Sequence, residues 1–171
     1  ATVTASASAM VRAYGSATVT ASRAVAVHLF DARVTVEGGV VIDVSKPLTD
    51  GPEWCEYHGV EVNDGVATLF KAVNDAWTTY RGFDYSPGAT PSAPDWRPDG
   101  ECGGGLHFSP SPMQALAYND DATRFVAVGV NVTDLHPIPG GTAKAKAPRV
   151  VRACVEVDQD GKPVEVEAAV R

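Results

Sequence analysis

Small and apolar side chains recur at a spacing of about eight residues along the first part of the chain. Blocks that begin at Ala1, Ala9 and Ala17 read ATVTASAS, AMVRAYGS and ATVTASRA, and the register continues to about residue 46. Each block has two apolar slots spaced by two, which places both on one face of a strand. The first slot holds Val3, Val11, Val19, Val27, Val34 and Ile42, and the second holds Ala5, Ala13, Ala21, Leu29, Val36 and Val44.

Residues 1–47 are therefore predicted to form a repeat of short β-strands. Strands of about five residues are not stable alone, so the blocks must stack or pair. Two blocks per coil would give a flattened β-solenoid with the valine slot inward, and a meander of hairpins is the alternative. Either arrangement predicts a stalk, a spacer or an oligomerising element that self-associates through the β-repeat.

The sequence turns polar and irregular over residues 48–66, which we predict to be a connecting segment. Asp50-Gly51-Pro52 and Asn63-Asp64-Gly65 are turn signals. Trp54, Tyr57 and the valines at 60 and 62 offer a hairpin strand that packs on one neighbouring domain as an alternative.

Alternation of apolar and polar residues predicts a compact α+β domain over residues 67–171. Strands are expected over 67–73, 106–108, 124–132 and 149–157, and a helix over 113–118. The predicted fold class is thus mainly β with a small α+β domain. A β-solenoid-like repeat of short strands is followed by a compact sheet with one or two short helices.

The charge balance argues against general binding of nucleic acid. The chain has a net charge of −7, from 14 basic and 21 acidic residues, and this opposes attraction to phosphate backbones. A local basic cluster is the exception, and it is either a phosphate site or a solvated strand face. Its members are Lys144, Lys146, Arg149 and Arg152.

The cysteines indicate neither a disulfide framework nor a zinc site. Cys55, Cys102 and Cys154 are odd in number and widely spaced, without a C-x-x-C motif. The cysteine pattern therefore predicts a reducing, cytoplasmic compartment and no bound metal. We also predict no membrane segment, because no run of about 18 apolar residues is present.

The run from Cys102 to Ser109 is the centre of the predicted second domain. Gly103, Gly104 and Gly105 allow a close approach of a ligand to the main chain. Alternation sends His107 to the face opposite Leu106 and Phe108, and a serine of the run Ser109-Pro110-Ser111-Pro112 is expected to cap the following helix. We expect His107 to line a pocket with Ser109 and at least one of Lys71 or Tyr85.

Candidate catalytic residues are His107 and Cys102. The remaining candidates are expected to bind a ligand, and they are Lys71, Tyr85, Gly104, Gly105, Ser109, Tyr118, Arg124 and Lys146. The proline-rich loop that follows Tyr80 carries many aromatic residues, which either pin the loop to the core or form a wall for a planar ring.

The order of these residues resembles a family of small bacterial and phage domains of unknown function. Its signature is Tyr-x-x-Gly, then Cys-x-x-Gly-Leu/Phe-His, then Pro and a short helix. Tyr85 to Gly88, Cys102 to His107, Pro112, Tyr118 and the strand at Arg124 match in order, within residues 69–157. The resemblance implies a shared fold and a shared use of Cys102, Gly105 and His107, without an established reaction.

A weaker similarity at the level of fold is to ADP-ribosyltransferases, and it implies NAD as ligand. Lys71 would stand at the place of the family's first-strand Arg or His, and His107-Phe108-Ser109 at that of its Ser-Thr-Ser strand. Glu156 would stand at the place of its late Glu.

Three functions follow from these residues. A non-catalytic interaction module displayed on a β-repeat, with a protein partner, is the preferred hypothesis. The first alternative is a site for NAD or another nucleotide around His107, with Ser109 and Lys146 or Arg124 near its phosphate. The second is a nucleophilic enzyme that uses a Cys102/His107 pair.

Overall fold

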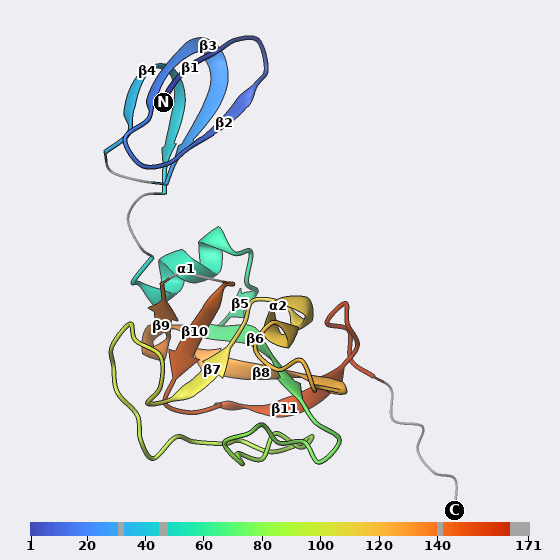
Figure 1. Cartoon of the computed structure of the whole chain (residues 1–171). Coiled ribbons are helices and arrows are strands. Elements are labelled where there is room, and N and C mark those ends of the chain that lie inside the picture. Colours follow the sequence, from blue (N-terminus) through green and yellow to red (C-terminus); the bar gives the residue numbers. More distant parts are fainter. Residues whose placement is uncertain (31–32, 45–47, 140–141, 165–171) are drawn as a thin grey trace, which may run out of the picture. The chain divides into compact units, whose positions relative to one another are not determined.

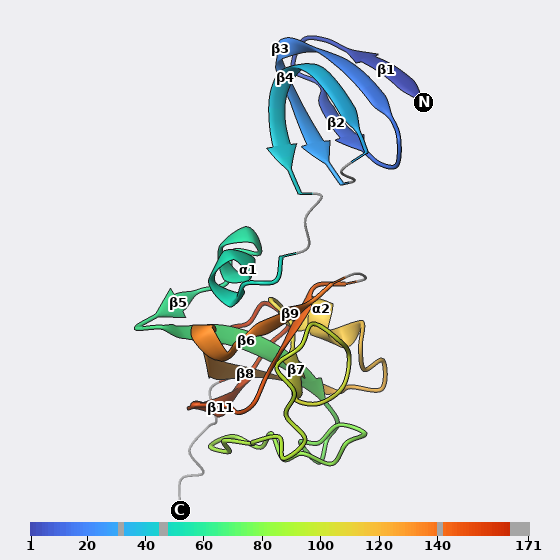
Figure 2. The ribbon, with the colours of Figure 1, turned by 90° about the vertical axis from the view of Figure 1, so that its left-hand side faces the viewer.

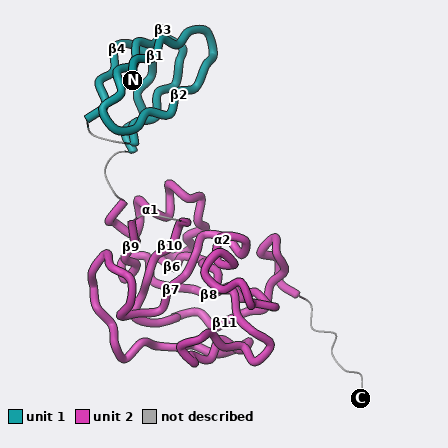
Figure 3. Tube along the Cα trace, in the orientation of Figure 1, with its two compact units in different colours: residues 1–47 teal, residues 48–171 magenta. Residues whose placement is uncertain are grey.

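A computed structural model describes residues 1–30, 33–44, 48–139 and 142–164 of the protein. The chain divides into two compact units, residues 1–47 and residues 48–171, each with a core of its own (Figure 3). Both units are built mainly from β-strands, and the described helices are short (Figure 1). The fold class expected from the sequence, mainly β with a small α+β part, is confirmed.

The first unit consists of strands that pair in parallel. They are β1 (Thr2–Ala5), β2 (Met10–Ala13), β3 (Thr18–Leu29) and β4 (Thr35–Asp43). The first half of β3 pairs with β1 and its second half with β2, while β4 pairs along both halves. Val3 lies opposite Val19 and Val11 opposite Val27, so each ladder joins blocks that are two repeats apart. A meander of hairpins would require antiparallel pairs, and that alternative is therefore wrong for the described strands.

The third turn of the repeat departs from the expected register. Val36, not Val34, lies opposite Val19, and Val41, not Ile42, lies opposite Val27. The offset between β3 and β4 changes at Gly38 and Gly39, which turn β4 with positive φ angles of 78° and 74°. This shorter corner accounts for the position of Val41, whereas the shift at Val36 precedes it. A side chain at Gly38 would collide with the carbonyl oxygen of the facing strand, so only glycine fits this tight corner.

The second unit contains two antiparallel sheets. The larger has the order β11-β8-β6-β5, and its strands are β5 (Val62–Asn63), β6 (Val66–Val73), β8 (Arg124–Asn131) and β11 (Arg152–Val157). The smaller has the order β7-β10-β9, and its strands are β7 (Leu106–Phe108), β9 (His136–Ile138) and β10 (Lys144–Ala147). The short helices are α1 (Gly51–Tyr57), α2 (Pro112–Leu116) and the 3-10 turn η1 (Val132–Asp134).

The two sheets share one core. Among the described residues, an isolated antiparallel β-bridge joins β6 to the end of β7, and it is called the crossing below. Leu69 of β6, Val128 of β8, Phe108 of β7 and Ala145 of β10 all belong to the same buried cluster. Strand β7 of the smaller sheet lies beside β6 of the larger one (Figure 2). Directly after β7, Ser109 exchanges two backbone hydrogen bonds with Phe70 of β6, with N–O distances of 2.9 and 3.0 Å. The crossing brings the middle of β6 against the end of β7.

The predicted connecting segment 48–66 belongs to the second unit and contains α1. Asp50 and Pro52, which indicated a turn, start this helix: Asp50 accepts a hydrogen bond from the Glu53 amide at 3.0 Å, and the proline occupies the first turn. Trp54 and Cys55 are buried in the main core. The same residue types signal a turn and a helix start, which explains why the helix was missed and a hairpin strand was considered.

Helix α2 ends earlier than predicted, and a serine of the predicted helix start caps it. Ser111 accepts a hydrogen bond from the Gln114 amide at 3.3 Å. Ser109 instead takes part in the crossing with β6. The predicted strand over 149–157 begins only at Arg152, while β9 and β10 were not predicted.

We predict that Val19→Asp unfolds the first unit and leaves the second folded. Val19 is 1% exposed in the small valine and alanine core, so an unpaired carboxylate there should cost at least about 3 kcal/mol. Hydrogen exchange of residues 1–44 should lose its protection. All three tryptophans, Trp54, Trp77 and Trp96, lie in the second unit, so their fluorescence should not change.

Thr20→Asp is the matched control, because Thr20 is the next residue on β3 and its side chain is exposed. Its exchange should stay close to that of the wild type. Equal protection of Val19→Asp and Thr20→Asp would contradict the inward position of the valine slot.

Candidate functional site

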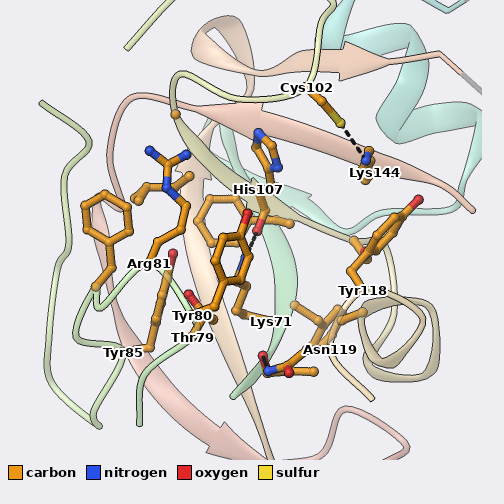
Figure 4. A pocket seen from close by; sticks show the side chains of 18 of the residues that line it. Lys71, Thr79, Tyr80, Arg81, Tyr85, Cys102, His107, Tyr118, Asn119 and Lys144 are labelled. Atoms are coloured by element: carbon orange, nitrogen blue, oxygen red, sulfur yellow. Dashed lines mark hydrogen bonds between the residues drawn. The ribbon is translucent and has the colours of Figure 1, made fainter. Parts of the chain in front are cut away.

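The second unit contains a cavity of about 190 Å³ beside the crossing of β6 and β7. Its walls come from β6, the loop over 79–85, the glycine run with β7, the region of α2, and the start of β10 (Figure 4). Seven of the ten residues proposed from the sequence line it, namely Lys71, Tyr85, Cys102, Gly105, His107, Ser109 and Tyr118. Gly104, Arg124 and Lys146 do not line it.

Lys71 lies on the core-facing side of β6, in the alternation that buries Leu69 and Val73. Its ammonium donates a hydrogen bond to the carbonyl oxygen of His107 at 2.7 Å, and it lies 5.7 Å from the centre of the Tyr85 ring. None of the ion pairs formed among the described residues includes Lys71. Burial, followed by the positive charges of Arg81 and Lys144, lowers the pKa of Lys71 to about 8.

His107 presents an unused ring nitrogen beside the cavity. Its Nε2 is buried and has no hydrogen-bond partner among the described residues. Burial, and next the charge of Lys71, lower the pKa of His107 to about 4, although a hydrogen bond to the Gly103 backbone acts in the opposite direction. The ring is therefore neutral at pH 7. With its other nitrogen bonded to the backbone, Nε2 is left as a free acceptor.

Two further cations line the cavity. Lys144 is predicted from the sequence only as a member of the basic cluster, which is either a phosphate site or a solvated strand face, and Arg81 is not predicted. Lys144 donates to the sulfur of Cys102 at 2.9 Å and lies 4.4 Å from the centre of the Tyr118 ring. Arg81 pairs with Asp95 and lies 5.6 Å from the centre of the Phe83 ring. Lys71, Arg81 and Lys144 therefore line one cavity, and no acidic side chain does so among the described residues.

Cys102 is exposed at the cavity and does not contact His107 through a hydrogen bond. Its sulfur is bonded to Lys144 instead. The Cys102/His107 nucleophilic pair considered from the sequence is thus not assembled in this structure, because the intervening glycine run carries the thiol toward β10.

Gly104 and Gly105 leave room for the neighbouring loop, residues 95–97, to pack against their backbone. A side chain at Gly105 would come within 2.9 Å of the Trp96 ring, and one at Gly104 would come within 2.9 Å of the Asp95 carbonyl oxygen. The space beside Gly104 is therefore filled by the neighbouring loop. Gly105 lines the cavity, but its lack of a side chain is required by Trp96.

Lys146 and Arg124 are both occupied by carboxylates away from the cavity. The fully buried Lys146 pairs with Asp99 and donates to the Gly103 carbonyl at 3.1 Å. Arg124 donates to Glu156 at 2.8 Å. Glu156, assigned above to the late Glu of ADP-ribosyltransferases, is held by this pair and does not line the cavity.

The loop over 79–85 supplies polar and aromatic groups that were only partly anticipated. Tyr80 is 92% exposed at the cavity, while Phe83 and the buried Tyr85 form part of its wall. Trp77 and Trp96 contact Arg124 and His136 and do not line it. Thr79 on this loop, and Asn119 beyond α2, add uncharged polar side chains. The aromatic residues of this region therefore divide into two groups. Tyr80, Phe83 and Tyr85 line the cavity, and the two tryptophans pack elsewhere.

No group of three His, Cys, Asp or Glu side chains suited to a metal ion occurs among the residues that the structure describes. Over the same residues, no helix has the length and apolar character that crossing a membrane requires. Cys55, Cys102 and Cys154 are all free thiols.

Residues 67–161 match the model of a protein family described as a domain of unknown function, DUF7666, and the chain belongs to this family. The match covers the same part of the chain as the resemblance seen in the sequence, and it includes every residue of the cavity wall. No curated protein and no solved structure shows significant similarity to the chain.

We predict that Lys71→Met removes a pH dependence of stability. The pKa of Lys71 is about 8 in the folded protein, below the ordinary 10.5 expected on unfolding. At Lys71 the unfolded chain therefore holds more protons than the folded one between these values, so this residue should raise the free energy of unfolding with pH across that window by on the order of 3 kcal/mol. The pKa values of Cys55 and Cys154, which burial raises to about 11, act in the opposite direction, so the effect of Lys71 is read as the difference between the wild type and Lys71→Met. Tryptophan fluorescence in urea at a series of pH values measures this in the second unit.

In Lys71→Met the rise should be absent, and stability at pH 7 should equal or exceed that of the wild type, because an unpaired ammonium is replaced by an apolar chain. Lys162→Met, at an exposed turn, should keep the wild-type pH dependence. An unchanged slope in Lys71→Met would contradict the assignment.

Proposed function

We propose that the second unit binds a small anionic ligand of the nucleotide or organic-phosphate class in the cavity beside His107. The observation that carries the proposal is the charge of the wall. Among the residues that the structure describes, three cations and no carboxylate line this cavity, in a chain whose net charge is −7. Clustered like charges repel each other, and a bound anion would remove that cost.

The individual contacts support an anion more than a cation or an apolar ligand. Lys71 has no carboxylate partner, and Lys144 is bonded only to a thiol and lies over the ring of Tyr118. Arg81 is already paired with Asp95, so its charge is partly compensated. Lys71 and Lys144 are therefore proposed as the principal anion ligands, with Arg81 in support.

The remaining wall suits the rest of such a ligand. The free Nε2 of His107 accepts a hydrogen bond from a hydroxyl or amino group, and Thr79 and Asn119 are further polar partners. Tyr80 offers an exposed aromatic face at the edge of the cavity. A volume of about 190 Å³ suits a phosphate with one ring or sugar. A whole nucleotide carries a phosphate, a sugar and a base, so part of it would extend past the edge of the cavity.

The proposal concerns binding and does not include transfer of ADP-ribose. That reaction was suggested by similarity alone, and its acidic residue would be Glu156, which Arg124 holds outside the cavity. The resemblance to bacterial and phage domains is in turn compatible with a ligand-binding module.

We propose that the first unit is a spacer or self-associating element of the solenoid type. Val40, Val41 and Ile42 on β4 are each more than two-fifths exposed, which leaves an apolar strand at one edge of the parallel sheet. Sedimentation at increasing concentration should show association of the full chain, and Val41→Lys should weaken it. A monomer at all concentrations would contradict the proposal.

The binding proposal is tested by calorimetry with pyrophosphate, ADP and NAD. We expect Lys144→Gln to weaken binding by about tenfold or more, equivalent to the loss of one charge-assisted contact. Lys162→Gln removes the same charge at an exposed turn outside the cavity and should bind like the wild type. Equal affinity in the two variants, or no heat with any of the three compounds, would contradict the proposal.

A further inference from the structure

We propose that Lys71 is a nucleophilic amine that forms an imine with a small carbonyl compound bearing a carboxylate or phosphate. The inference rests on the anion site proposed above and names its substrate class, a 2-oxo acid or an anionic aldehyde. It follows from the position of Lys71 in the cavity wall, from its contacts, and from the absence of a carboxylate in that wall among the described residues.

Lys71 and Lys146 both have amines held by contacts inside the second unit, and their environments differ. Lys146 is fully buried and is matched by the carboxylate of Asp99. Lys71 has only a carbonyl oxygen and aromatic rings around its amine. A desolvated ammonium without a counter-ion favours its neutral form, and the neutral amine is the nucleophile. At a pKa of about 8, roughly a tenth of the Lys71 side chains are neutral at pH 7.

The amine is held in place at the cavity. It donates to the His107 carbonyl at 2.7 Å and lies 5.7 and 6.0 Å from the ring centres of Tyr85 and Phe108. One hydrogen of the neutral amine satisfies that carbonyl, which leaves its lone pair available. This restraint resembles the positioning that lowers the entropic cost of a bimolecular step.

Arg81 and Lys144 can bind the anionic group of the carbonyl compound. Arg81 and Lys144 lie on opposite sides of the His107 ring (Figure 4). An anionic group bound by either cation brings an attached carbonyl carbon into the same small cavity as Lys71. The unpartnered Nε2 of His107 is available in this wall to accept and return a proton.

The step is balanced without an oxidant or reductant. The nitrogen of Lys71 attacks the carbonyl carbon, a C–N bond forms, and the π electrons move to oxygen. The nitrogen loses a proton to Nε2 of His107, and Nε2 returns that proton to the oxygen, which gives a carbinolamine. A second proton then moves from the nitrogen to the hydroxyl by the same route. The C–O bond breaks as the C=N bond forms, so one amine and one carbonyl yield one imine and one water.

Reductive trapping of the full chain with glyoxylate and cyanoborohydride tests the inference. Peptide mapping should place the adduct on Lys71 at a rate at least about tenfold above that of the exposed Lys162. The rate should level off near pH 8, and inorganic phosphate should compete. Acetaldehyde, which carries no anion, should react more slowly at Lys71. His107→Gln should slow trapping without removing phosphate binding.

Phosphate binding is measured in parallel by NMR, so the two proposals fail separately. Phosphate binding with no preference for Lys71 in trapping would overturn the imine while leaving the anion site. Rapid trapping at Lys71 with no phosphate binding or competition would support the amine and overturn the anion site. Uniform labelling of Lys71 and Lys162 would also overturn the imine, and this result is read from the wild type without any variant.

Discussion

The crossing of β6 and β7 determines where the chemistry of the second unit lies. Two backbone hydrogen bonds between Phe70 and Ser109 fix the two strands against each other. The next residue on β6, Lys71, then meets the carbonyl of His107, one residue before the end of β7. Without this crossing, a lysine in the core-facing alternation of β6 would be buried with no polar partner, at a cost that few domains tolerate.

The two basic residues that were proposed from the sequence and lie outside the cavity have carboxylate partners, whereas most of the described cations that line it do not. Lys146 and Arg124 have Asp99 and Glu156 as partners, and both lie outside the cavity. Of the three cations that line the cavity in the described part of the chain, Arg81 pairs with a carboxylate, that of Asp95. Lys71 contacts a carbonyl oxygen and Lys144 contacts a thiol. Because buried or clustered charges are costly without compensation, their arrangement in one wall is best explained by a ligand that supplies the missing negative charge.

The periodicity of apolar residues predicted most of the strands and the side of β7 on which His107 lies. The alternation around Leu106 and Phe108 correctly separated His107 from the apolar side of β7. The repeat in residues 1–44 anticipated the short strands β1 and β2, but β3 and β4 each continue through two blocks.

Local signals failed where one motif serves two structures, as at Asp50-Gly51-Pro52, or where a glycine corner shortens a turn, as at Gly38. The sequence did not predict Arg81, and it did not place Lys144 beside His107. Their shared cavity depends on packing between segments far apart in sequence, which periodicity does not report.

The pKa of Lys71 in the absence and presence of phosphate tests the central claim most directly. NMR of the protein labelled at the lysine side chains follows this group, with Lys71→Met identifying its signal. The account predicts a pKa near 8 in the free protein and a rise toward the ordinary value when phosphate binds. A pKa near 10.5 in the free protein that phosphate does not change would contradict it.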